Sequence, residues 1–118
     1  MIPRRGEIYL VDLTVNTVGS EQGGVRPAVI VQNEAGNEHS TTTIICPLTS
    51  KVKKNIPTHV DLRKEDCGIL RDSTVLCEQV RAVSKERLKK KLGEVTNMQK
   101  LNDINQKMII SLGLVVGG

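Results

Sequence analysis

Apolar and polar residues alternate in short runs along most of the chain, a pattern typical of β-strands. Residues 7–13 alternate in the manner of a half-buried strand, and residues 27–32 form a short buried run rich in β-branched side chains. Further strands are predicted over residues 41–48, 58–62 and 73–83, the last as one strand or as two joined by a kink near residues 78–79.

The segments between these runs are polar. Residues 14–26 are predicted to form a long loop, and long loops in small domains are more often functional than idle. Residues 33–40 are interpreted as a connection, residues 49–50 as a turn into a basic loop, and residues 63–68 as a turn or a single helical turn. No segment has the composition of a domain linker, so residues 1–118 are interpreted as one domain.

Near the end of the chain the apolar spacing becomes that of an amphipathic helix. Thr96 is predicted to cap this helix and Gly113 to end it in a left-handed conformation. Ser84 is a candidate cap for a separate short helix. The apolar positions of the main helix are Met98, Leu101, Ile104, Met108 and Leu112. Many strands followed by one helix predict a mainly β fold, a small closed or half-closed barrel with a C-terminal α-helix packed on it.

Composition narrows the ways in which such a barrel could recognise a ligand. The chain has no Phe and no Trp, and Tyr9 is its single aromatic residue. Single-strand binders usually stack bases on several aromatic side chains, so any base recognition here would rest on hydrogen bonds, backbone groups and arginine planes. The net charge of +4 and the pI of about 9.1 are compatible with a nucleic acid or an acidic protein as partner, and equally with a merely soluble basic surface.

Several classes of site and location are disfavoured by the residues present. Cys46, Cys67 and Cys77 are odd in number and lack CxxC spacing, which favours a reducing compartment over a disulfide scaffold. His39 and His59 stand alone, with no metal-ligand cluster, and the sequence has no P-loop, dinucleotide fingerprint or nucleophile elbow. We therefore expect no metal and no cofactor. With no signal-peptide core and no membrane-length apolar run, we expect a cytoplasmic protein with no membrane partner.

The most informative segment is S-E-Q-G-G-V-R-P at residues 20–27, which lies between two apolar runs. The two adjacent glycines allow unusual backbone angles, and Pro27 biases Arg26 toward an extended conformation. A guanidinium matches phosphate geometry with two parallel hydrogen bonds. Such an arginine could stabilise the charge that develops on phosphorus when a ribose 2′-hydroxyl attacks it, so metal-free RNA cleavage is one reaction that this chain could support.

Other residues offer weaker chemical signals. His39 and His59 would be the natural acid and base for RNA cleavage, but isolated histidines are more often ordinary surface or strand residues. Thr49 places a hydroxyl at the end of the third strand, where turn chemistry is the simpler interpretation.

Taken together, the ordered motifs resemble the MazF/PemK family of toxin endoribonucleases, most closely its branch in Gram-positive bacteria. The motif E-Q-G-G-x-R-P is specific, and the ordered set covers nearly the whole chain. The matching segments are R-G-E-I-Y at 5–9, G-S-E-Q-G-G-V-R-P at 19–27, V-Q-N at 31–33, P-L-T-S at 47–50, P-T-H-V at 57–60, D-S at 72–73 and E-Q-V-R at 78–81.

The resemblance implies an SH3-like barrel of the MazF/CcdB type that works as a homodimer. It implies sequence-specific, metal-independent cleavage of single-stranded RNA (mRNA), leaving a 2′,3′-cyclic phosphate and a 5′-hydroxyl. It also implies inhibition by a cognate antitoxin whose flexible acidic tail occupies the RNA-binding surface. The family's paired catalytic residues fall on Arg26 and Thr49. Arginine and threonine are poor proton carriers at neutral pH, so electrostatic stabilisation and positioning are the roles expected for them.

By the same resemblance the substrate path would be flanked by a wider set of residues, while His39 falls in a variable loop. The predicted substrate-binding residues are Ser20, Glu21, Gln22, Gly23, Gly24, Ser50, Lys53, His59 and Gln79. Two other functions stay open: a CcdB-like gyrase poison on the same fold, and a non-catalytic barrel that binds RNA or protein. The sequence specifies neither the cleavage motif nor the antitoxin.

Overall fold

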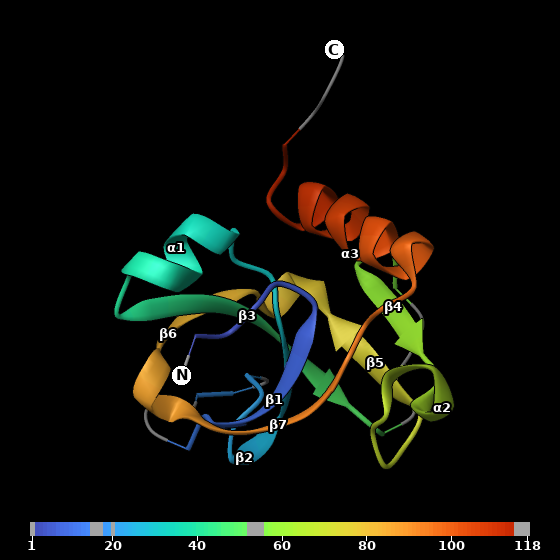
Figure 1. The fold of residues 1–118 in the computed structure, drawn as a ribbon. Coiled ribbons are helices and arrows are strands. Elements are labelled where there is room, and N and C mark those ends of the chain that lie inside the picture. Colours follow the sequence, from blue (N-terminus) through green and yellow to red (C-terminus); the bar gives the residue numbers. More distant parts are fainter. Residues whose placement is uncertain (1, 15–17, 20, 52–55, 115–118) are drawn as a thin grey trace.

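The computed structural model describes residues 2–14, 18–19, 21–51 and 56–114. Most of its elements are short strands, and the longest helix closes the described part of the chain (Figure 1). The elements are β1 (Glu7–Asp12), β2 (Val25–Ile30), α1 (Glu34–His39), β3 (Thr42–Thr49), β4 (His59–Leu62), α2 (Lys64–Cys67), β5 (Ser73–Leu76), the 3₁₀ helix η1 (Cys77–Gln79), β6 (Arg81–Ser84), the 3₁₀ helix η2 (Lys85–Arg87), β7 (Leu88–Glu94) and α3 (Met98–Ser111).

The strands form one antiparallel sheet that bends around the core. Its order is β4-β5-β3-β2-β1-β7, and β6 pairs with the first half of β3. The long strand β3 is central because β2 pairs with its middle and β5 with its last residues. The end strands β4 and β7 do not pair with each other within the described residues, so the barrel is half-closed. The predicted mainly β barrel with a C-terminal α-helix is confirmed.

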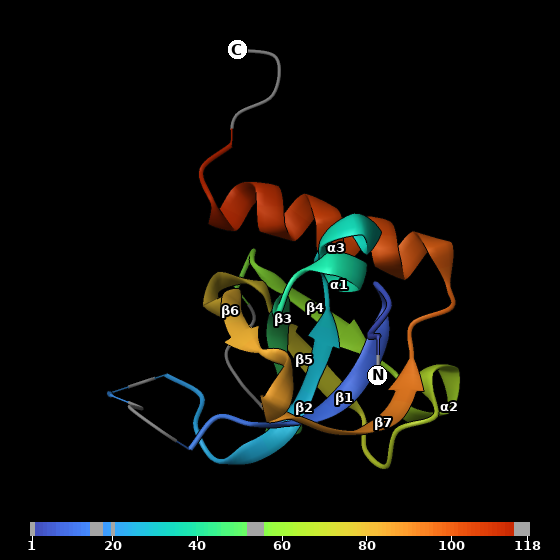
Figure 2. The same cartoon turned by 60° about the vertical axis from the view of Figure 1, so that its left-hand side comes forward.

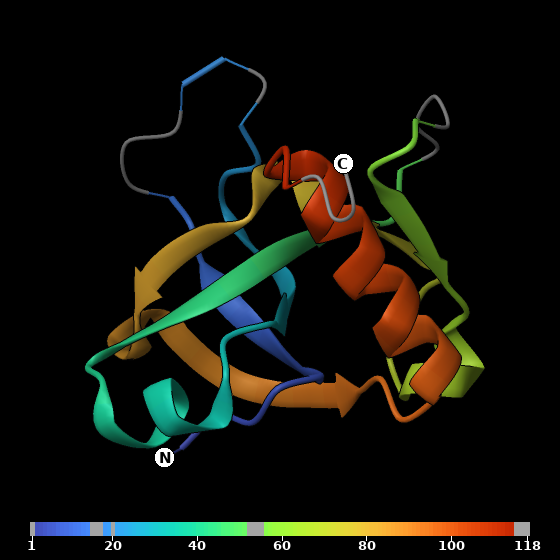
Figure 3. The same cartoon turned by 90° about the horizontal axis from the view of Figure 1, so that it is seen from above.

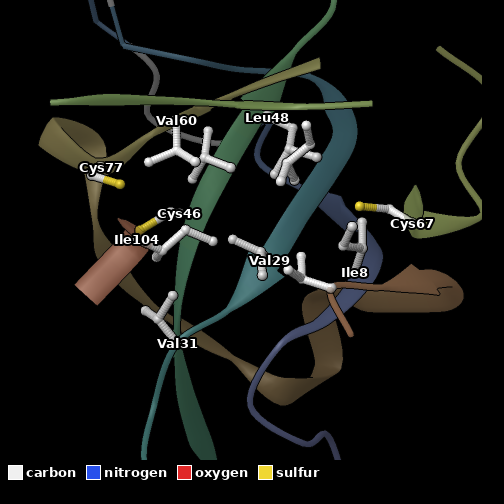
Figure 4. Close-up of a cluster of buried hydrophobic side chains, with 12 residues drawn as sticks. Ile8, Val29, Val31, Cys46, Leu48, Val60, Cys67, Cys77 and Ile104 are labelled. Atoms are coloured by element: carbon white, nitrogen blue, oxygen red, sulfur yellow. The ribbon is translucent and has the colours of Figure 1, made fainter. Parts of the chain in front are cut away.

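The core has two apolar clusters, one on each face of β1 and β2. Ile8 and Val29 belong to the first cluster, which reaches β4 and the helix α3, whose Ile104 side chain is 1% exposed (Figure 4). Tyr9 and Ala28, the next residues along each strand, belong to the second cluster. Successive side chains of a strand point to opposite faces, so these two strands are buried on both sides. Helix α3 lies over η1 and β4, across one side of the sheet (Figure 3).

Two elements differ from the prediction. Residues 33–40 contain α1, because Asn33 caps a helix by accepting the N–H of Gly36 at 2.8 Å. Asn37 of α1 is 1% exposed, and its amide oxygen accepts the hydroxyl of Thr43 at 2.7 Å. Residues 88–94 form β7, which the run of lysines at 89–91 concealed as a polar segment.

Several element boundaries also differ. β2 begins at Val25, so Arg26 lies inside a strand and not at the end of a loop. Asn97, and not Thr96, caps α3 by accepting the N–H groups of residues 99 and 100. Gly113 follows the helix with φ of 69°, as predicted. The expected kink near residues 78–79 is the 3₁₀ helix η1, and the hydroxyl of Ser84 caps the short helix η2.

The three cysteines are free and buried. None of the helices in the described residues is long and apolar enough to cross a lipid bilayer.

Candidate active site

The strands β2 and β3 bring Arg26 and Thr49 to the same place. The antiparallel ladder between these strands ends at Ala28 opposite Pro47, so Arg26 and Thr49 each lie two residues beyond its last pair. Both residues, together with Ser50, line a cavity of about 720 Å³ at this end of the strands. Residues that are 23 positions apart in the sequence therefore line one cavity.

Local contacts hold the guanidinium and the hydroxyl. The Nε–H of Arg26 donates to the carbonyl of Gly23, which ties the side chain to the loop before β2. The carbonyl of Gly24 accepts the N–H of Leu13 at 2.8 Å, and Gly24 has φ of 75°, a conformation that favours glycine. Thr49 is 4% exposed, and its Oγ1 accepts the N–H of Lys51 at 3.3 Å. The two groups are thus preorganised at the cavity wall.

The charged side chains at this cavity are all cationic. The basic residues lining it are Arg26, Lys51, Arg71, Lys90 and Lys91, and no Asp or Glu is among the described lining residues. Their fields add, so the cavity favours an anion.

One of these cations is held by a buried carboxylate. Lys91 Nζ lies 2.9 Å from Oε2 of Glu7, and this hydrogen bond is the largest cause of a raised pKa for Lys91. The charges of Glu7 and Glu94 raise it further, so Lys91 stays protonated at neutral pH. Burial, then the charge of Glu7, raises the pKa of the Tyr9 phenol, whose hydroxyl donates to Glu7 at 3.4 Å. Tyr9 is 3% exposed and cannot stack on a base.

A second, smaller cavity of about 280 Å³ collects three of the predicted substrate-binding residues. Glu21, Gln22 and Gln79 line it, as do Pro47, Glu78, Val80 and Arg81. The Oε1 of Gln79 accepts the backbone N–H of Gln22 at 2.8 Å, which joins the loop before β2 to η1. Pro47 of β3 lies two residues before Thr49, so β3 contributes to the walls of both cavities.

The remaining candidates within the described residues line neither cavity. His59 lines neither cavity: its side chain is 5% exposed, and its Nε2 lies 3.1 Å from Oε2 of Glu78. His39 is exposed beside Glu38. Gly23 and Gly24 line neither cavity and act through their backbone carbonyls.

Ser20 and Lys53 lie outside the described residues. The sequence motifs did not predict as site residues three of the charged residues that line the two cavities: Arg71, Glu78 and Arg81. The lysine clusters at 51–54 and 85–91 were the visible signal for the basic cavity wall. No group of three or more potential metal-ligating side chains occurs among the described residues.

Comparison with known proteins agrees with the family resemblance along nearly the whole chain. Residues 4–112 match the sequence model of the family described as PemK-like, MazF-like toxin of type II toxin-antitoxin system. The chain is 46% identical over 112 residues to the endoribonuclease MazF of Staphylococcus saprophyticus, covering 94% of this chain and 92% of the relative.

Solved structures agree with the sequence comparison. MazF (Form-I) from Deinococcus radiodurans superposes with a TM-score of 0.82 at 27% identity, covering 97% of this chain and 99% of that one. A mycobacterial endoribonuclease in complex with its cognate antitoxin gives a TM-score of 0.79 at 32% identity, covering 97% and 98%.

Proposed function

This chain belongs to the PemK-like, MazF-like family of toxins of type II toxin–antitoxin systems, and we propose that it is an endoribonuclease that cleaves single-stranded RNA. The observation that carries the proposal is the meeting of Arg26 and Thr49 at one cationic cavity. We further propose that the substrate is mRNA, that cleavage is sequence-specific, and that residues 1–118 form a single toxin domain.

The proposed reaction needs no external nucleophile. The 2′-hydroxyl attacks the neighbouring phosphorus and loses its proton, while the bond from phosphorus to the 5′ oxygen breaks and that oxygen gains a proton. The products are a 2′,3′-cyclic phosphate and a 5′-hydroxyl. Arg26 stabilises the negative charge on the phosphoryl oxygens, because its guanidinium is fixed and permanently charged. Thr49 positions the 2′-hydroxyl or the phosphate.

Attack of the 2′-hydroxyl on the neighbouring phosphorus requires no metal or cofactor. We propose that cleavage by this protein is independent of both. The second cavity supplies carboxylate and amide groups that suit base edges, so Glu21, Gln22 and Gln79 are proposed to read sequence. Ser20 and Lys53 keep their proposed role as RNA contacts on the family resemblance alone. His59 is proposed to support Glu78 and not to contact RNA, since it is buried against that carboxylate.

The cationic cavity is also the surface at which we propose that the nuclease is inhibited. We propose a cognate acidic antitoxin as partner, supported by the cationic cavity and by family membership. A homodimer and a cytoplasmic location are proposed on the family resemblance.

The test is cleavage of a long mixed-sequence RNA by purified protein in EDTA. We expect discrete fragments with 5′-hydroxyl ends from the wild type and none from Arg26→Ala. Arg63→Ala is the matched control, because Arg63 pairs with Glu65 at 2.8 Å and lines neither cavity. Full activity in Arg26→Ala would overturn the site assignment.

Absence of cleavage by folded wild-type protein, free of antitoxin, would overturn the nuclease proposal. It would favour a gyrase-poisoning toxin or a non-catalytic barrel, which supercoiling and RNA-binding assays then separate.

A further inference from the structure

The larger cavity continues well beyond Arg26 and Thr49. Its far wall is made by β7 and by the segment that joins α2 to β5, which lie side by side (Figure 2). A Cβ at Gly93 would lie 2.0 Å from the carbonyl oxygen of Cys67, so only glycine allows this close approach. The lining residues at this end are Gly68, Ile69, Leu70, Arg71, Lys90, Lys91 and Leu92.

Two cations at this end have no partner among the described residues. Lys91 is paired with Glu7, but the side chains of Lys90 and Arg71 make no hydrogen bond or ion pair with any described residue. Both residues are exposed. Two unpaired cations of the same cavity, one on β7 and one before β5, can bind anionic groups without first breaking an internal ion pair.

Aliphatic side chains lie between and beside these cations. Leu70 is 93% exposed next to Arg71, and Ile69 and Leu92 are only partly buried against the core. A leucine side chain that is this exposed at a cavity can pack against a flat apolar surface. Nucleobases can stack between apolar side chains. The single aromatic residue, Tyr9, is buried elsewhere and cannot take that role.

We propose that this end of the cavity is a second RNA subsite, in which Lys90 and Arg71 bind phosphodiester oxygens and Leu70 packs on a base. The inference rests on the proposed nuclease function, because the strand whose scissile phosphate lies at Arg26 would continue along the same cavity. That continuity favours RNA over an acidic peptide, which has no phosphate to place at Arg26. The subsite binds the strand beside the cut and takes no part in the chemistry.

The test measures RNA affinity against salt. The probe is an RNA that the wild type cuts, synthesised with a 2′-deoxyribose at the cut so that it stays intact. We expect Lys90→Gln and Arg71→Gln each to weaken binding several-fold and to reduce the slope of log affinity against log salt by about 0.7, the value for one released phosphate contact. Lys89→Gln is the matched control, since Lys89 is exposed on the same strand but does not line the cavity.

Each result decides the inference. Equal slope changes in the Lys89 and Lys90 variants would overturn it, because a general charge effect would then explain the loss. Weaker binding of poly-glutamate with unchanged RNA affinity would also overturn it, in favour of an acidic protein as occupant. If the wild type cuts RNA and the two variants bind as it does, only the subsite is wrong. If the wild type cuts no RNA, the proposed function fails first.

Discussion

The side-chain carbonyl of Gln79 accepts the backbone N–H of Gln22 at 2.8 Å, and so links η1 to the loop that precedes β2. Gly23, the next residue of that loop, presents the carbonyl that receives the Nε–H of Arg26. On the other side, Glu78 of η1 is held by the His59 ring at 3.1 Å and by the Thr58 hydroxyl at 3.0 Å. Hydrogen bonds and chain neighbours in η1 and the loop therefore connect β4 to the guanidinium.

Gln79→Met should slow cleavage through Arg26 without unfolding the protein. The substitution removes the acceptor for Gln22 at similar length, and one lost hydrogen bond of about 1.4 kcal/mol corresponds to about a tenfold lower rate. Single-turnover cleavage at saturating enzyme, which separates the cleavage rate from any loss of RNA binding at Gln79, and thermal melting measure the two effects. Gln99→Met on the exposed face of α3 is the control, and an unchanged rate in Gln79→Met would show that the link does not position Arg26.

Thr49→Val should abolish most cleavage while preserving the fold. Valine keeps the shape of this 4% exposed side chain but removes the hydroxyl, and loss of one preorganised group in such a site costs about 100- to 1,000-fold in rate. Thr49→Ser should restore activity, because the hydroxyl returns. Rates under saturating enzyme test the pair, and a fully active valine variant would remove Thr49 from the mechanism.

Gly93→Ala should destabilise the protein. Its Cβ would meet the backbone carbonyl of Cys67 at 2.0 Å, and overpacking against backbone typically costs about 1–3 kcal/mol. Gly36→Ala is a useful comparison, since the three nearest contacts of its Cβ would be atoms of the Gln32 side chain, at 2.9 to 3.1 Å, and a side chain yields more easily than backbone. Thermal unfolding of both variants should therefore show the larger loss of stability for Gly93→Ala. A smaller loss for Gly93→Ala than for Gly36→Ala would contradict the close packing of β7 on α2.

Acid should weaken the attachment of the N-terminal segment to α1. The Arg5 N–H, followed by the Asn37 amide, donates to Glu34 and lowers the pKa of that carboxyl below its ordinary 4.5. A lowered folded-state pKa stabilises the protein above 4.5, and this contribution is lost as pH falls through the folded value. The melting temperature of Glu34→Gln should be below that of the wild type at neutral pH and converge with it in acid. A constant difference would exclude this linkage.

The elements that the sequence predicts well are those whose side chains follow a simple period. β1 alternates, and α3 carries apolar residues at helical spacing, so local pattern and tertiary burial agree for both. α1 is different: it has six residues, including Gly36, and tertiary hydrogen bonds of Asn37 to residues 32 and 43 hold it. β7 was hidden because its exposed lysines carry no apolar signal.

By itself, the sequence determined the strand-rich class, the C-terminal helix and, through its motifs, the candidates Arg26 and Thr49. Only the tertiary structure decided their surroundings. Pairing of β2 with β3 brings the two residues to one cavity just beyond the end of the ladder, while burial removes His59 from it. Lys90 and Arg71 join the same wall because β7 packs against α2 at Gly93. These residues come from segments that are far apart in the sequence. The local sequence pattern shows the period and propensity of each segment, but not which segments lie side by side in the folded chain.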